Sequence, residues 1–137
     1  MRLKFARHAM AAAVGVALVT VTSASPAFAA GGCNTSNPTI SVCVNHGDSG
    51  LNTRGDFYIN RTPDSSIYKY KEVLVVNGSE RGSKTGRITQ TGRHCCLYLN
   101  LQTLPVSTKS VKTRVYVYTR SGALHMTVDS PTISVRN

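Results

Sequence analysis

Short runs in which apolar and polar residues alternate constrain the fold of this chain more than any other feature. In the clearest run, residues 111–119, Val111, Thr113, Val115 and Val117 lie on one side, and charged residues and tyrosines lie on the other. A period of two is typical of a strand with one side against a core and the other in solvent. Similar runs rich in Val, Ile, Thr and Tyr recur between Gly, Asn, Ser and Pro.

This pattern predicts an all-β fold of about seven or eight short strands. A small antiparallel β-sandwich, Ig-like in style, is the favoured architecture, and a small β-barrel is the second choice. The turn at 119–122 ends in glycine and predicts a hairpin between 111–119 and 123–129. The glycine-rich segments 45–54 and 77–86 are predicted to be loops.

Residues 1–29 have the features of a secretory signal peptide. Arg2, Lys4 and Arg7 precede an apolar run at 10–21, and Ala27-Phe28-Ala29 gives the small-x-small pattern of a cleavage site. The apolar run is about half the length that a membrane span needs, so no membrane span is expected. We therefore predict that cleavage leaves residues 30–137 as a single domain. This domain is expected to be secreted and extracellular, with association at the cell surface as a variant.

Four cysteines remain after the predicted cleavage, and an even number in a small exported domain predicts two disulfide bonds. They are Cys33, Cys43, Cys95 and Cys96. Because the usual Cα separation of a disulfide exceeds that of adjacent residues, we expect Cys95 and Cys96 each to pair with Cys33 or Cys43. Adjacent strand residues point to opposite sides, so one bridge is expected in the core and the other outside it. Paired cysteines in an exported chain favour disulfides over metal, so neither a metal site nor a cofactor is predicted.

The charge balance favours an anionic partner. Without the first 29 residues the chain carries thirteen Lys or Arg and six Asp or Glu, a net charge of +7. Such a surface attracts nucleic acid, cell-wall polymers, acidic lipid or acidic proteins.

One strand side combines these cations with tyrosines, and we predict that it is the binding face. Its residues are Lys112, Arg114, Tyr116 and Tyr118. Tyrosine rings stack on sugars or bases, and the cations attract phosphate or carboxylate. Replacing the first three of these residues with serine is expected to abolish retention on a polyanion column at moderate salt. A second run, Tyr68-Lys69-Tyr70-Lys71, alternates in the same way, but its tyrosines and lysines point to opposite sides.

We therefore expect a secreted, non-catalytic binding protein that recognises an anionic or carbohydrate polymer, the cell envelope or a protein partner. One alternative is a small secreted, nuclease-like hydrolase with His46 or His94 as general base beside Glu72 and an arginine. Nothing in the spacing of these residues favours a catalytic geometry. A third hypothesis is a protease inhibitor or antagonistic toxin that acts through the segment 45–54 or 77–86.

Overall fold

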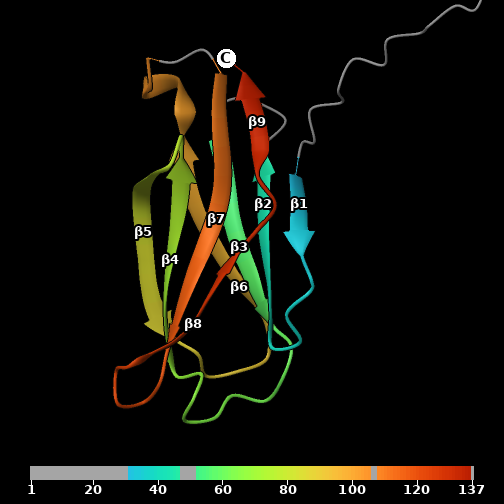
Figure 1. The fold of residues 1–137 in the computed structure, drawn as a ribbon, viewed down its shortest axis with the longest axis vertical. Coiled ribbons are helices and arrows are strands. Elements are labelled where there is room, and N and C mark those ends of the chain that lie inside the picture. The colour runs from blue at the N-terminus through green and yellow to red at the C-terminus, as the bar shows by residue number, and fades with distance from the viewer. Residues whose placement is uncertain (1–30, 47–51, 106–107, 137) are drawn as a thin grey trace, which may run out of the picture.

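The computed structural model describes residues 31–46, 52–105 and 108–136, which form an all-β fold (Figure 1). The predicted signal peptide and part of the predicted loop 45–54 lie outside the described residues. Among the residues described, no helix is long and apolar enough to cross a membrane.

Two antiparallel sheets face one another. The first sheet contains β1 (Gly31–Asn34), β2 (Ile40–His46), β3 (Asn52–Ile59) and β6 (Gly92–Asn100), in that order. The second sheet contains β5 (Ser79–Arg87), β4 (Lys69–Val76), β7 (Thr108–Tyr118) and β8 (Leu124–Asp129), in that order. The last strand, β9 (Ile133–Arg136), also pairs with β7, and the 3-10 turn η1 (Leu101–Thr103) follows β6. This arrangement is consistent with the predicted small β-sandwich.

The core lies between the sheets in two apolar clusters, as the period-two pattern predicts. The first cluster contains Ile40, Val42, Phe57, Ile59, Ile67, Tyr70, Ile88, Val115, Val117 and Val128. The second contains Val44, Leu74, Val76, Leu101, Val111, Ile133 and Val135. The four residues predicted to point inward from 111–117 are fully buried. The predicted hairpin is also present: β7 pairs with β8, and Gly122 has a φ of 90° in the turn between them.

The predicted loop at 77–86 is wrong, because most of it is strand β5. The turn between β4 and β5 consists of Asn77 and Gly78, whose φ angles of 50° and 82° are typical of a tight hairpin turn. The strand is at the edge of its sheet, and most of its residues are exposed. A strand with neither side buried needs no apolar alternation, and polar, charged residues protect such an edge from pairing with other chains.

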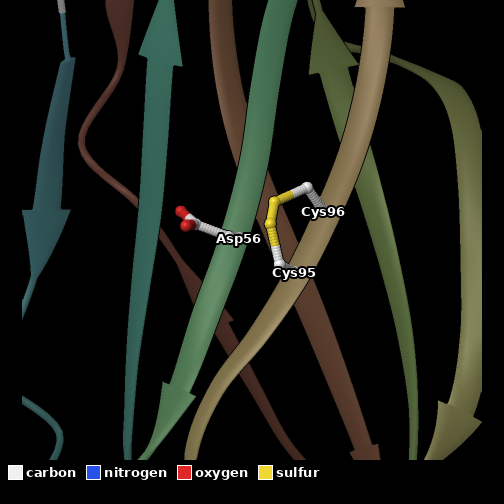
Figure 2. A group of neighbouring side chains, drawn as sticks. All are labelled: Asp56, Cys95 and Cys96. Atoms are coloured by element: carbon white, nitrogen blue, oxygen red, sulfur yellow. A yellow bond between two sulfur atoms is a disulfide. The ribbon is translucent and has the colours of Figure 1, made fainter.

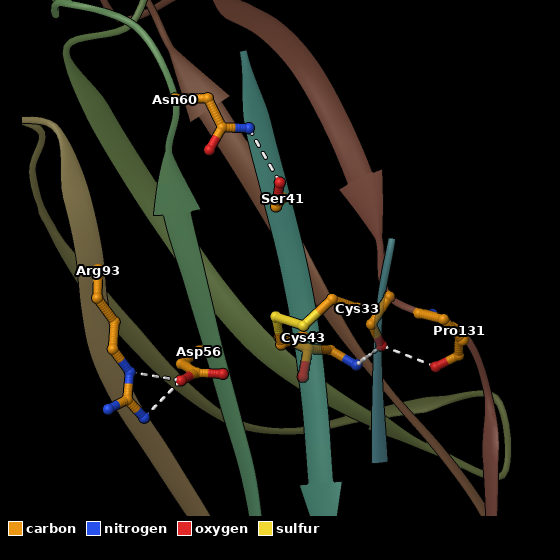
Figure 3. The surroundings of a disulfide bond; sticks show 9 residues. Cys33, Ser41, Cys43, Asp56, Asn60, Arg93 and Pro131 are labelled. Atoms are coloured by element: carbon orange, nitrogen blue, oxygen red, sulfur yellow. Dashed lines mark hydrogen bonds and ion pairs between the residues drawn. A yellow bond between two sulfur atoms is a disulfide. The ribbon is translucent and has the colours of Figure 1, made fainter. Parts of the chain in front are cut away.

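The predicted disulfide pairing is also wrong. Cys33 on β1 and Cys43 on β2 lie opposite one another, 4.0 Å apart at Cα, and are bonded to each other (Figure 3). Cys95 and Cys96 are bonded to one another. The physical reason is the strand order, because β3 separates β2 from β6 in the first sheet. The prediction that one bridge lies in the core is not met by Cys33–Cys43: Val42 and Val44 point inward, so Cys43, although buried, points to the outer side of the first sheet.

Replacing Cys33 and Cys43 together with serine is expected to lower the free energy of unfolding by about 2–3 kcal/mol. The reason is that the bond closes a short loop, with a sequence separation of 10, rather than the long loops that pairing with β6 would close. Urea unfolding of the variant and the parent checks this. A loss well above that range would indicate that the bridge also holds β1 against the rest of the sandwich.

Candidate functional site

The four predicted binding residues lie side by side on the outer side of the second sheet. Along β7 the inward residues are buried, whereas Lys112, Arg114, Tyr116 and Tyr118 are each half-buried. Strand β4 flanks β7 on one side, and β8 and β9 flank it on the other. The side chains that could bind a ligand therefore come from several strands.

The half of this face around Lys112 and Arg114 is partly neutralised. Asp129 on β8 lies opposite Arg114, whose Nε and Nη2 donate to its carboxylate oxygens at 2.6 and 2.9 Å. Lys112 Nζ donates to the same carboxylate at 2.5 Å. The arginine first, and the lysine after it, hold the pKa of Asp129 below its usual value. These two cations already share an anion within the protein.

Glu80 on β5 neutralises the next part of the face. The Tyr116 hydroxyl donates to Glu80 Oε1 at 2.6 Å, and Lys71 Nζ lies 3.0 Å from Oε2. Lys71 Nζ also lies 5.5 Å from the centroid of the Tyr116 ring. The hydrogen bonds from Tyr116 and Lys71 hold the pKa of Glu80 low, and the bond to Glu80 raises the pKa of Lys71.

The Tyr118 end of the face carries cations without such partners. Lys69 on β4 lies opposite Arg87 on β5 and opposite Tyr118 on β7, so the three form one row across the sheet. They border a hollow of about 440 Å³, which we call the basic groove. Its lining residues are Lys69, Tyr70, Lys71, Thr85, Gly86, Arg87 and Tyr118. Among the described residues, no carboxylate forms an ion pair with Lys69 or Arg87.

Of the residues in this row, only Tyr118 belongs to the binding face predicted from the sequence. The alternation at Tyr68-Lys69-Tyr70-Lys71 was the available signal for Lys69, because the lysines of that run point outward while Tyr70 is buried. Arg87 carried no such signal, because its place in the row depends on the pairing of β5 with β4.

The two histidines considered for a hydrolase lie apart in the first sheet. His46, on β2, has its Nδ1 3.1 Å from the Thr53 hydroxyl. His94, on β6, stacks its ring on Phe57 with 4.9 Å between centroids. In the described part of the chain, no hydrogen bond or ion pair joins either imidazole to a carboxylate. The hydrolase therefore stays a prediction without a geometric basis in these residues.

Asp56, Cys95 and Cys96 converge on the outer side of the first sheet, with their potential ligand atoms within 4.8 Å of one another (Figure 2). The two sulfurs are bonded together, and a disulfide offers no thiolate to a metal. The Asp56 carboxylate already accepts from Arg93, with Nε at 2.7 Å and Nη2 at 2.6 Å (Figure 3). This bonding raises the pKa of Arg93. In this state the group does not suit a metal ion.

Comparisons of this chain with protein-family models, with curated proteins and with solved structures found no match.

Proposed function

We propose that this protein is an exported, non-catalytic binding protein that recognises an anionic polymer through the outer side of its second sheet. The observation that carries the proposal is the basic groove, where Lys69 and Arg87 stand in one row with Tyr118 and have no ion-pair partner among the described residues. A hollow lined by cations concentrates positive potential and attracts polyanions. Export is supported by the features of residues 1–29 and by two disulfide bonds, which persist in oxidising compartments.

The ion pairs divide the predicted face into parts with different expected contributions. A polyanion that contacts Lys112 or Arg114 competes with Asp129, and one that contacts Lys71 competes with Glu80. Lys69 and Arg87 have no such internal competitor. Tyr118 is the member of the predicted set that lines the groove, and its ring offers a surface for a sugar or a base. We therefore infer that the Tyr118 end contributes most of the affinity.

Replacing Lys69 and Arg87 with serine is expected to abolish retention on a heparin column at moderate salt. The plot of log affinity against log salt concentration should become shallower by about one for each cation removed. The matched control replaces Lys112 and Arg114 with serine, which removes the same number of charges from the same face. This control should weaken retention less, because Lys112 and Arg114 already form ion pairs with Asp129. An equal loss of retention in the two variants would contradict the inference that the Tyr118 end contributes most of the affinity. A parent protein that a heparin column does not retain would refute the proposed function.

A further inference from the structure

Two arginines from separate elements meet at one tyrosine ring beside the basic groove. The guanidinium carbon of Arg87, on β5, lies 5.7 Å from the centroid of the Tyr68 ring. The guanidinium carbon of Arg120, in the turn between β7 and β8, lies 4.9 Å from the same centroid. The two guanidinium groups are therefore within about 11 Å of one another. Each contact is a cation–π interaction.

Backbone hydrogen bonds hold these residues in place. Tyr68 N donates to Tyr118 O at 2.9 Å, and Ile88 N donates to Tyr68 O at 2.9 Å. Arg120 N donates to Ser65 O at 2.8 Å, which ties the turn to the segment before Tyr68. The main chain thus holds the backbone segments that carry Tyr68, Arg87 and Arg120 next to one another.

This pair of cations has no anion within the described structure. Asp56, Asp64, Glu80 and Asp129 are each paired with other cations, and Glu72 is buried between the sheets. Neither Arg87 nor Arg120 forms an ion pair with a described carboxylate. Two like charges near one another without a counter-charge repel, and an anion placed between them relieves the repulsion.

We propose that Arg87 and Arg120 together bind one phosphodiester group of a polyol-phosphate polymer that runs through the basic groove. This inference rests on the proposed function and names the chemistry of its ligand. Each guanidinium can donate two parallel N–H groups to an oxyanion. The oxygens of a tetrahedral phosphate point in different directions, so two guanidinium groups from different elements can bind it at once. The two oxygens of a planar carboxylate, in contrast, can both accept from the parallel N–H groups of a single guanidinium.

A second hollow beside Arg120 offers space for the spacer between the phosphates. It has a volume of about 590 Å³ and is lined by Ser65, Ser66, Thr119, Arg120, Ser121 and Ala123. Four of these residues carry hydroxyl groups, and those of Ser66, Thr119 and Ser121 already form hydrogen bonds within the protein. The Ser65 hydroxyl has no such bond among the described residues, and a hydroxyl can both donate to and accept from a polyhydroxylated chain. Arg87 lines the basic groove and Arg120 lines this second hollow. Single-stranded nucleic acid is the competing ligand: a base could stack on Tyr118 in the groove, but at Tyr68 it would compete with the two guanidinium groups that already contact the ring.

The test compares the binding of three soluble polymers of matched length: poly(glycerol phosphate), polygalacturonate and oligothymidylate. The parent protein is expected to bind poly(glycerol phosphate) at least about tenfold more tightly than the other two. The variant R87K/R120K keeps both charges but loses both guanidinium forks. It should lose about tenfold in affinity for poly(glycerol phosphate) and retain its affinity for polygalacturonate. The control R81K changes an exposed arginine of the same strand and should alter neither.

The outcomes separate this inference from the proposed function. Binding of the parent to polygalacturonate as tightly as to poly(glycerol phosphate), or an equal loss for both polymers in R87K/R120K, would overturn the phosphodiester assignment and leave polyanion binding intact. Tightest binding to oligothymidylate would replace the polyol phosphate with nucleic acid. A parent protein that binds none of the three polymers would overturn the inference together with the proposed function.

Discussion

Replacing Glu72 with glutamine is expected to stabilise the protein by about 3 kcal/mol more at pH 8 than at pH 4, relative to the parent. Glu72 points from β4 into the sandwich and is 1% exposed, and neither of its carboxylate oxygens has a hydrogen-bond partner in the described structure. Burial raises the pKa of Glu72 from 4.5 to about 7; the nearby Lys84 opposes this rise and Asp56 adds to it. A buried, unpaired carboxylate is costly when ionised.

The sign follows from the raised pKa. The folded protein holds the Glu72 proton more tightly than the unfolded chain does. The contribution of Glu72 to stability is therefore fully present below about pH 4.5 and is lost as the pH rises through about 7. Glutamine does not ionise, so this loss disappears in the variant. Denaturant unfolding of both proteins at several pH values measures the effect. Glu80→Gln is the matched control, because the pKa of this exposed glutamate is lowered. The prediction is contradicted if the unfolding free energies of the parent and of Glu72→Gln change with pH in the same way. That result would mean that a partner neutralises the buried carboxyl.

Phe57→Ala is expected to lower the free energy of unfolding by about 3–5 kcal/mol, the range for removing a buried phenylalanine side chain. Phe57 is fully buried and is the largest such side chain of the described residues. Its ring packs edge-on against Tyr70, with centroids 4.8 Å apart, and stacks on His94 at 4.9 Å. These contacts join both sheets, because Tyr70 lies on β4 and His94 on β6. The substitution therefore removes apolar burial and two aromatic contacts at once.

The neighbouring residue provides the control for this prediction. Tyr58 follows Phe57 on β3 but points to the outer side, where it is 37% exposed. Tyr58→Ala should change the unfolding free energy by only about 0.5 kcal/mol, as is usual for surface positions. Similar losses for the two variants, measured by urea unfolding, would be inconsistent with the face assignment of β3.

The sequence predicts those parts of the fold in which a buried side imposes a pattern. Strand β7 was predictable because neighbours on both sides keep it central and its inward residues alternate without exception. Strand β5 was not predictable, because at an exposed edge its polar residues resemble those of a loop. The Cys33–Cys43 bridge was missed for a related reason: β1 contributes two glycines, one cysteine and one asparagine, and shows no apolar alternation.

The candidate site was only partly predictable. The outward direction of Lys112, Arg114, Tyr116 and Tyr118 followed from the period of the strand. Their neutralisation did not, because it depends on the register that places Arg114 opposite Asp129 across the hairpin, where a bulge between Val117 and Tyr118 shifts the pairing. The row of Lys69, Arg87 and Tyr118 joins three strands and exists only once both pairings of β4 are known.

Strand β7 has hydrogen-bonded neighbours on both sides, and this affects how fast its amide protons exchange with solvent. This strand is hydrogen-bonded to β4 on one side and to β9 and then β8 on the other, so its amide protons are expected to exchange with solvent last. Strand β5 pairs with one neighbour and should exchange early. The basic groove therefore combines a rigid wall at Tyr118 with an arginine on a strand that opens readily. A polymer that bridges them would slow the exchange of β5 and leave β7 unchanged.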